Sequence, residues 1–352
     1  MESLRLLIGG SPSKIFHLNE FSEKLTDLGM ESKVVLDTDY CDSFPSKKIS
    51  NLVFKKNKLP DLISEYKPDI ILVDRQRHFG LESLKTKIPL LVHLRGDFWN
   101  EIQWAKETRY NKFPKTIAIK KWEEIGERIF QNAEGILPIC KFLENKVQEK
   151  FPKKNTYVLY QGINSENWFL EKGMQLKHPC IGLVQSANIW GKTLEMLILK
   201  NVLKKFPNIT FYWVGDGPYA KKILLELSQF DNFKWLGNLQ YPNKIRQFLS
   251  EIDIYALISG IDMSPLTLLE AQLMKKPVIA TSVGGIPELI EDGKTGFLIN
   301  KQNEDELIEK ISILLYQKID DFGENGRNFV SKKFSWEKIS VDFIEFVKDQ
   351  II

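Results

Sequence analysis

The sequence has few cysteines and no long apolar run. Its three cysteines, Cys41, Cys140 and Cys180, lie far apart. An odd and sparse set of cysteines argues against a disulfide framework and fits a reducing compartment. No apolar stretch approaches the roughly 20 residues that a membrane-spanning helix needs. The first residues, MESLRLLIGG, predict a strand and lack the apolar core and cleavage site of a signal peptide. We therefore expect a cytoplasmic protein.

Several motifs that carry catalysis are also absent. The chain has no P-loop, no HExxH, no paired CxxC and no GxSxG. Its four histidines, His17, His78, His93 and His178, do not have the spacing of metal ligands. A formal net charge of only +3 implies no nucleic-acid partner. These absences disfavour a metalloenzyme and a triad hydrolase, and we predict no bound metal and no cofactor.

Apolar and amphipathic segments alternate along the whole chain. A length of 352 residues predicts two domains, at about 150 residues per domain. Runs that are apolar on both faces are typical of parallel strands buried beneath helices. They lie at 4–8, 33–37, 69–74, 89–94, 135–139 and 156–160, and again at 180–184, 209–215, 233–237, 252–258, 277–281 and 296–299. Amphipathic stretches between them, such as 14–29, predict helices, so we expect an α/β fold with two doubly wound, Rossmann-like sheets.

Two further segments bear on the organisation of the chain. The polar stretch 164–179, NSENWFLEKGMQLKHP, predicts a linker between the two domains. Residues 335–350 have apolar positions at helical spacing and predict a closing helix. We therefore place the domains at 1–170 and 171–334, followed by a C-terminal helix over 335–352.

Residues 98–131 mix aromatic and basic side chains. The aromatic residues are Trp99, Trp104, Tyr110, Phe113 and Trp122, and the basic residues between them are Lys106, Arg109, Lys112, Lys115, Lys120 and Lys121. Such a mixture can hold a protein at an anionic membrane surface. The same pattern also fits a pair of helices with a buried aromatic face and a solvated charged face, which we favour because aromatic stripes at helical spacing are usually core.

Glycines follow three of the predicted strands. They are Gly9-Gly10, Gly215-Asp216-Gly217-Pro218 and Gly284-Gly285. Glycine at a strand-to-helix junction lets backbone N–H groups approach a ligand, and the following helix N-terminus favours anions such as phosphate. Tight turns often need glycine for the turn alone, so each junction is weak evidence by itself. Together, the three junctions predict a ligand that carries phosphate.

The most informative stretch is 255–299, YALISGIDMSPLTLLEAQLMKKPVIATSVGGIPELIEDGKTGFLI. It contains Asp262, seven further residues, Glu270 and Ala271, then Lys276-Pro277-Val278 and the sequence GGIPE at 284–288. In this order the stretch resembles the C-terminal domain of the retaining GT-B glycosyltransferases of family 4 (glycosyl transferases group 1). Weaker matches at 160–164, 214–218, 236–237 and 334–336 extend the resemblance over nearly the whole chain.

The resemblance implies roles for particular residues. Glu270 would accept hydrogen bonds from the ribose hydroxyls of a nucleotide-sugar, Asp262 would contact the transferred sugar, and Lys192 would bind the donor diphosphate. His93, at the end of the run PLLVHL, would touch the sugar. The implied donor site comprises Gly9, Gly10, Lys192, Gly215, Asp262, Ser264, Leu266, Glu270, Gly284, Gly285 and Glu288, with His93, Lys192, Asp262 and Glu270 taking part in transfer.

We therefore predict a GT-B architecture in which two Rossmann-like domains face each other across a cleft. Residues 1–170 would bind the acceptor, and residues 171–334 would bind a UDP- or GDP-linked sugar donor. The implied reaction is a metal-independent transfer with retention at the anomeric carbon, to a glycan or lipid-linked acceptor. Peripheral contact with the inner membrane surface through 98–131 is the corresponding localisation hypothesis.

Two alternatives stay open at this stage. The chain has Asp262 where the family usually has glutamate. It also lacks the family's usual arginine before Lys192, since residues 184–187 are Val-Gln-Ser-Ala. These departures motivate a catalytically inactive relative that only binds a nucleotide. A different enzyme on the same fold, such as a nucleotide-sugar epimerase, also fits the looser motifs of the first half.

Overall fold

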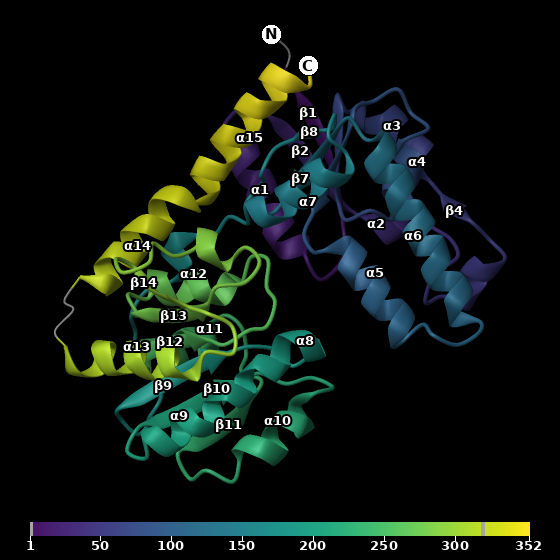
Figure 1. Ribbon diagram of the computed structural model, residues 1–352. Helices are drawn as coiled ribbons and strands as arrows, with labels where there is room; N and C mark the ends of the chain where they lie inside the picture. The colour runs from purple at the N-terminus through teal and green to yellow at the C-terminus, as the bar shows by residue number, and fades with distance from the viewer. Residues whose placement is uncertain (1–2, 318–320) are drawn as a thin grey trace. The chain divides into compact units, whose positions relative to one another are not determined.

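The computed structural model describes residues 3–317 and 321–352, which divide into two compact units (Figure 1). Unit 1 comprises residues 1–162 together with 336–352, and unit 2 comprises residues 163–335. The first boundary therefore lies at 162/163 and not at 170/171. Ile163 already belongs to unit 2, because its N–H donates to the carbonyl of Phe334 (2.9 Å) and it forms a β-bridge with Ser335.

Unit 1 is built on a six-stranded parallel sheet in the order β2-β1-β5-β6-β7-β8. The strands are β1 (Arg5–Gly10), β2 (Glu31–Leu36), β5 (Ile70–Asp74), β6 (Leu90–Leu94), β7 (Gly135–Pro138) and β8 (Asn155–Thr156). All residues of β5, β6 and β7 are buried, as both-face apolar runs predict. Strands β3 (Cys41–Asp42) and β4 (Lys56–Asn57) form a separate antiparallel pair.

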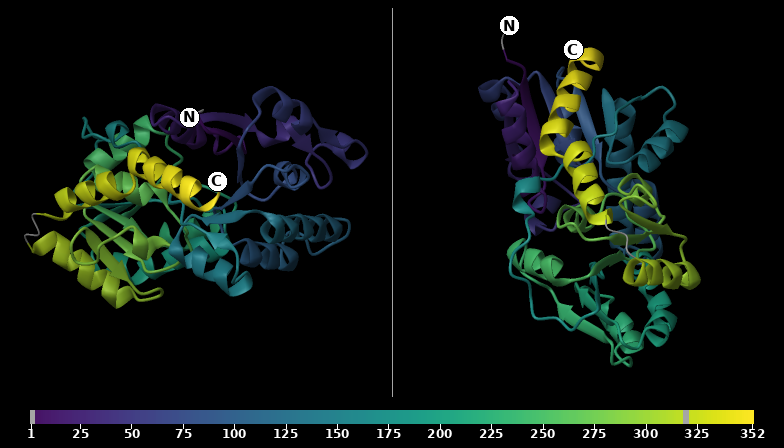
Figure 2. Two further views of the ribbon diagram at one scale, coloured as in Figure 1. Left: turned by 90° about the horizontal axis from the view of Figure 1, so that it is seen from above. Right: turned by 90° about the vertical axis from the view of Figure 1, so that its left-hand side faces the viewer.

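Helices cover both faces of this sheet. The helical segments of unit 1 are α1 (Ile15–Asp27), α2 (Asp37–Tyr40), η1 (Ile49–Leu52), α3 (Leu59–Tyr66), α4 (His78–Ser83), α5 (Phe98–Glu107), α6 (Lys115–Asn132), α7 (Lys141–Lys150) and α15 (Trp336–Gln350). The predicted closing helix is α15, which packs beside α1 (Figures 1 and 2). Phe21 of α1 contacts the rings of Trp336 and Phe343, with centroids 5.4 and 5.3 Å apart. The C-terminal helix therefore completes the core of the unit in which the chain begins.

Unit 2 contains a second six-stranded parallel sheet, in the order β11-β10-β9-β12-β13-β14. Its strands are β9 (Cys180–Val184), β10 (Thr210–Val214), β11 (Phe233–Gly237), β12 (Ile254–Leu257), β13 (Val278–Thr281) and β14 (Gly296–Ile299). Numbered within the unit, this is the order 3-2-1-4-5-6 of a doubly wound dinucleotide-binding sheet. The strand order reverses direction between β9 and β12, and ligands of such sheets bind outside the carboxyl ends of the strands at that point.

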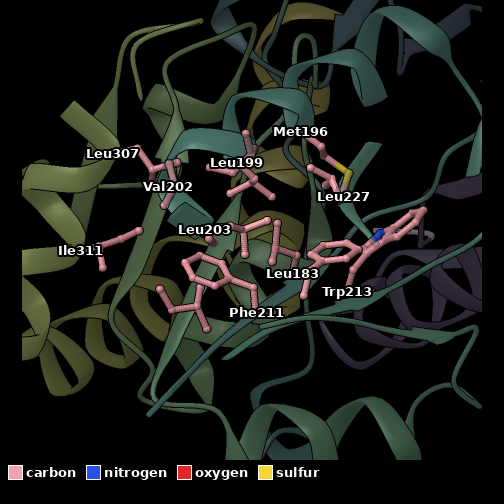
Figure 3. Packing of buried hydrophobic residues seen from close by; sticks show 14 of the residues in the cluster. Leu183, Met196, Leu199, Val202, Leu203, Phe211, Trp213, Leu227, Leu307 and Ile311 are labelled. Carbon is pink, nitrogen blue, oxygen red and sulfur yellow. The ribbon is translucent and has the colours of Figure 1, made fainter. Parts of the chain in front are cut away.

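The core of unit 2 lies between this sheet and helices from three parts of the chain. Figure 3 shows Leu183, Phe211 and Trp213 of the sheet beside Leu199 and Val202 of α9. Ile311 of α13 belongs to the same cluster. The helical segments of unit 2 are η2 (Ser165–Asn167), α8 (Trp190–Thr193), η3 (Leu194–Ile198), α9 (Leu199–Lys205), α10 (Ala220–Leu227), α11 (Asn243–Glu251), α12 (Leu266–Leu273), η4 (Ile286–Glu288), α13 (Glu304–Tyr316) and α14 (Phe322–Lys333).

The predicted linker 164–179 is wrong, because this segment packs on unit 2. Trp168 is buried, and its carbonyl accepts a hydrogen bond from the guanidinium of Arg327 (3.0 Å). Glu171 pairs with Arg246 at 2.6 Å. The polar composition of the segment gave no indication of these tertiary contacts. None of the helices in residues 3–317 and 321–352 is both long and apolar enough to cross a lipid bilayer.

Candidate active site

Four loops gather at the carboxyl edge of the second sheet. They follow β9, β10, β12 and β13, which are neighbours in one parallel sheet and therefore end on the same side. Hydrogen bonds and close approaches between these loops hold their backbones together. Most of the residues predicted from 255–299 lie on them or at the start of α12.

Glu270 lies on α12 and is almost completely buried. One carboxylate oxygen, Oε1, accepts a hydrogen bond from the hydroxyl of Tyr241 (3.2 Å). The other, Oε2, has no hydrogen-bond partner among the residues that the structure describes. Burial raises the pKa of this carboxyl to about 8, and the Tyr241 hydroxyl opposes the rise. An inward-facing carboxylate with one vacant acceptor is suited to a ligand that donates hydrogen bonds, such as a diol.

Lys192 and Asp262 form an ion pair between the loops that follow β9 and β12. Both side chains are mostly buried, with 19% and 14% exposed. The backbone of the two loops is joined as well, since the N–H of Gly260 donates to the carbonyl of Lys192 (3.0 Å). The structure therefore brings together the two residues that the sequence assigns to the diphosphate and the sugar, with opposite charges in contact.

The Gly284-Gly285 turn packs directly against the backbone of Asp262. The N–H of Gly285 donates to the carbonyl of Asp262 (3.0 Å). Gly284 has a φ of +57°, and a Cβ at this position would lie 2.0 Å from the same carbonyl oxygen. Only glycine fits here, for both its positive φ and its lack of a side chain. The pair of glycines thus fixes the position of Asp262.

The Gly215-Asp216-Gly217 turn packs in the same way against the loop after β9. A Cβ on Gly215 would lie 2.0 Å from the carbonyl oxygen of Gln185, and both glycines have positive φ. The N–H of Ala187 donates to the carbonyl of Asp216 (2.9 Å). Gly215 therefore has a structural reason to be glycine, and its predicted contact with the donor stays a prediction.

The remaining predicted residues of unit 2 lie around these loops. Leu266 is the first residue of α12, Ser264 lies two residues before it, and Glu288 lies in the short turn η4. The Ser264 hydroxyl and the Oε1 of Gln185 are buried, and no residue in 3–317 or 321–352 hydrogen-bonds to them. Together with Glu270, these residues are three buried polar side chains that each keep an atom without a hydrogen-bond partner among the described residues. They lie on α12 and on the loops after β9 and β12. Such groups are costly unless a ligand or water satisfies them.

In unit 1, Gly9 and Gly10 are the last two residues of β1 and do not follow it. A Cβ on Gly9 would lie 2.7 Å from the ring of Phe79, and one on Gly10 would lie 2.2 Å from Leu18. Both backbones pair with β2. Side chains of the neighbouring helices pack so closely on the strand that both positions require glycine. The glycines therefore give no separate evidence for the predicted phosphate contact.

His93 is buried at the end of β6, and its Nε2–H donates to the carbonyl of Leu159 (3.1 Å). Burial and the neighbouring Arg95 guanidinium lower the pKa of His93 to about 3, so the ring is neutral at physiological pH. Arg95 in turn donates to Asp74 (3.2 Å) and to Gln161. This arrangement favours a structural role for His93, and its contact with the sugar stays a prediction.

Reasoning from the sequence missed two residues of these sites. Asp74 ends the apolar run 69–74 and is buried beside Arg95. An acidic residue at the end of a predicted buried strand could have identified it from the sequence. Tyr241 reaches Glu270 from the loop before α11, and nothing in its surrounding sequence indicates this. Asp97, which follows the same strand as His93, caps α5 by accepting from the N–H of Asn100 (3.3 Å) and pairs with Lys146.

A comparison with protein families matches residues 180–317 to the model described as glycosyl transferases group 1. This range holds Lys192, Asp262, Glu270 and the Gly284-Gly285 turn. Residues 180–317 form a glycosyl transferases group 1 domain. The uncharacterized glycosyltransferase MJ1178 of Methanocaldococcus jannaschii is 31% identical over 219 residues, which are 59% of this chain and 57% of that protein. The chain spans about half the length of the curated relatives that it matches first.

Solved structures extend the similarity in fold beyond the group 1 domain. Sucrose-phosphate synthase from Thermosynechococcus elongatus superposes with a TM-score of 0.74 over 98% of each chain at 14% identity. Anabaena Alr3699/HepE in complex with UDP-glucose gives 0.69 over 98% of this chain and 99% of that chain at 18% identity. At these identities the similarity establishes the fold alone. The two Rossmann-like units thus have the GT-B fold.

Proposed function

We propose that this protein is a glycosyltransferase that takes a sugar from a nucleotide-sugar bound by the group 1 domain. The observation that carries the proposal is the buried carboxylate of Glu270, whose Oε2 has no partner in residues 3–317 and 321–352. It lies near the switch point of a sheet with the strand order of dinucleotide-binding sheets. The two ribose hydroxyls of a nucleotide would supply the missing hydrogen bonds. The group 1 match and the UDP-glucose in the Anabaena structure support this type of donor.

The Lys192–Asp262 pair would separate when the donor binds. A diphosphate presents more negative charge to Lys192 than one carboxylate does, and Asp262 would then accept hydrogen bonds from hydroxyls of the sugar. As the bond from the anomeric carbon to the phosphate oxygen breaks, charge grows on the diphosphate, where Lys192 stabilises it. The leaving phosphate would take the acceptor proton on the same face of the sugar, so the configuration is retained and neither a metal nor an enzymatic nucleophile is required.

The test is release of nucleoside diphosphate from a panel of UDP- and GDP-linked sugars, with water as the default acceptor. We expect one donor to be hydrolysed, with the sugar released first as the anomer present in the donor, which NMR detects before mutarotation. Activity should persist with a chelator. Release of the opposite anomer, or loss of activity with the chelator, would refute the mechanism, and tight nucleotide binding without turnover would support the inactive relative.

We further propose that unit 1 contacts an anionic membrane surface, which would suit a lipid-linked acceptor. Of the aromatic residues at 98–131, Trp99 packs against Phe130, but Phe113 is 80% exposed and Trp122 is 38% exposed. The indole N–H of Trp122 donates to the carbonyl of Pro45 (3.2 Å), which joins α6 to the loop that contains η1. That loop exposes further apolar side chains beside lysines: Ile49, Leu52, Val53 and Phe54, with Lys47, Lys48 and Lys55.

Co-sedimentation with vesicles tests this second proposal. We expect binding to vesicles rich in phosphatidylglycerol and little binding to phosphatidylcholine, because lysines add electrostatic attraction to apolar insertion. Phe54→Glu should reduce the binding. Leu225→Glu, at a leucine of unit 2 that is 79% exposed, should not change it. Equal binding by both variants, or no binding by the unaltered protein, would refute membrane contact through this surface.

A further inference from the structure

A second cluster of chemically active side chains lies at the opposite edge of the second sheet. His178 and Cys180 stand at the start of β9, and Asp253 directly precedes β12, the strand beside it. His178 Nδ1 lies 2.9 Å from Asp253 Oδ2 and 3.8 Å from the Sγ of Cys180. The three ligand-type atoms all lie within 4.8 Å of one another. The proposed active site is at the carboxyl ends of these strands, so the cluster is separate from it.

We propose that His178, Cys180 and Asp253 bind a thiophilic divalent cation, of which Zn²⁺ is the best match. An imidazole nitrogen, a thiolate and a carboxylate are each ligands of Zn²⁺, at distances of about 2.0–2.3 Å. Ligand atoms arranged tetrahedrally around such an ion are roughly 3–4 Å apart. The two distances from His178 Nδ1, 2.9 and 3.8 Å, agree with this spacing. Thiolate and carboxylate together carry the two negative charges that balance the cation.

A fourth side chain orients the histidine in the way that metal sites require. His178 Nε2 lies 2.9 Å from Glu251 Oε1. A metal-bound histidine usually donates its other ring N–H to a carboxylate or carbonyl, which fixes the ring and its tautomer. The Asp253 carboxylate is held too, since its Oδ2 accepts the N–H of Cys180 at 2.7 Å. Each exposed ligand is therefore already positioned by a further contact.

Binding exchanges protons for the metal. The cation would replace the proton on His178 Nδ1, now directed at Asp253, and the proton on the thiol, and both protons would leave to solvent. Cys180 is buried, while the side chains of His178 and Asp253 are 43% and 39% exposed, so one side of the cluster is open for entry and for a water ligand. Lys276 lies nearby, but its amino group donates to the carbonyl of Ser250 (2.9 Å).

This proposal differs from the expectation, drawn from the sequence, that the histidines lack the spacing of metal ligands. His178 and Cys180 are two residues apart, but the third ligand is 73 residues away from Cys180 along the chain. Only the pairing of β9 with β12 brings them together. Because the cluster joins the amino ends of these strands, the cation would stabilise unit 2 and take no part in sugar transfer.

The experiment is a titration of the full-length protein, freed of metal by a chelator, with Co²⁺. A cobalt–thiolate bond gives a charge-transfer band in the near ultraviolet. We expect the band to saturate at one equivalent and to be displaced by Zn²⁺. Cys180→Ala should abolish it, whereas Cys140→Ala, the matched change at another buried cysteine, should not. Glu251→Gln should weaken binding by about 10–100-fold.

Thermal unfolding supplies a second readout and checks that the variants fold. Zn²⁺ should raise the Tm of the unaltered protein and of Cys140→Ala but not that of Cys180→Ala. Cys180→Ser serves in place of Cys180→Ala if the alanine variant does not fold. Absence of the cobalt–thiolate band, or an equal band in Cys180→Ala, would overturn the proposal and leave His178 as a histidine hydrogen-bonded between two carboxylates. Neither outcome depends on glycosyltransferase activity.

Discussion

At the scale of single residues, the role proposed for Glu270 requires negative charge, whereas its buried surroundings oppose that charge. Its carboxyl is buried on α12, and among the described residues its hydrogen-bond partner is the hydroxyl of Tyr241. Burial raises the pKa of this carboxyl to about 8, which favours its protonated form near neutral pH. The hydroxyls of a bound nucleotide would favour the charged form, so donor binding and ionisation of Glu270 should be coupled.

This coupling predicts how stability depends on pH. The pKa of Glu270 is about 8 in the folded protein and near 4.5 when the chain is unfolded. The folded state therefore binds the extra proton, so the contribution is fully present below pH 4.5 and is lost as the pH rises to about 8. In Glu270→Gln this part of the pH dependence should disappear. Parallel Tm profiles from pH 5 to 8 for the two proteins would contradict the prediction.

The Lys192–Asp262 ion pair leads to a second prediction about single residues. Asp262→Asn removes the carboxylate that pairs with Lys192, so free UDP or GDP should bind about fivefold more tightly, roughly 1 kcal/mol. Transfer should nevertheless fall, because the sugar loses its charged acceptor. Lys192→Met should weaken nucleotide binding instead. Calorimetric titration of the three proteins decides this, and a weaker nucleotide affinity in Asp262→Asn would argue against competition for Lys192.

At the scale of elements, the loop that carries Gly284 depends on a close backbone contact. Gly284→Ala must place a Cβ 2.0 Å from the carbonyl of Asp262, whereas Gly293, with a similar positive φ of +74°, has open space around it. Gly293→Ala should therefore cost about 1 kcal/mol in backbone strain alone. Gly284→Ala should cost more and should also weaken donor binding. Unfolding in urea and nucleotide titration measure both, and equal effects would contradict the proposed role of the turn.

The strands were predictable because parallel strands buried on both faces leave continuous apolar runs, as at 180–184 and 69–74. The run 156–160 was only partly correct, since β8 ends at Thr156. Beyond it, only scattered hydrogen bonds continue the alignment, such as the Leu159 N–H to the carbonyl of Pro138 (2.9 Å). The reasons for Gly9 and Gly10 were not predictable, because they lie in side chains brought near by folding. The surroundings of His93 likewise depend on Leu159, 66 residues away.

At the scale of the whole molecule, unit 1 is made of two separate stretches of the chain, because the last helix, α15, packs with the first 162 residues. α15 supplies Phe343 to a core that begins with β1 and α1, so unit 1 cannot complete its core before the C-terminus is present. Motif spacing placed the predicted donor residues of 255–299 in one stretch, because they follow one another along the chain. The boundary at 162/163 was not visible in the sequence, because it depends on the pairing of Ile163 with Ser335.

Phe343→Ala should therefore destabilise unit 1 by about 3–5 kcal/mol, the usual cost of removing a buried aromatic ring. Hydrogen exchange in α1 and β1 should accelerate, while exchange in the strands of unit 2 should not change. Phe16→Ala is the matched control, because the Phe16 ring is 54% exposed on α1. Faster exchange in unit 2 as well would show that the two units do not unfold independently.

The central claim is that the group 1 domain holds a nucleotide through Glu270. The most direct measurement is the thermal shift produced by UDP, GDP, ADP and their sugars on the unaltered protein and on Glu270→Ala. We predict that one nucleotide and its sugar raise the Tm selectively, and that the shift is lost in Glu270→Ala. An undiminished shift in the variant, or no shift with any nucleotide, would contradict this assignment.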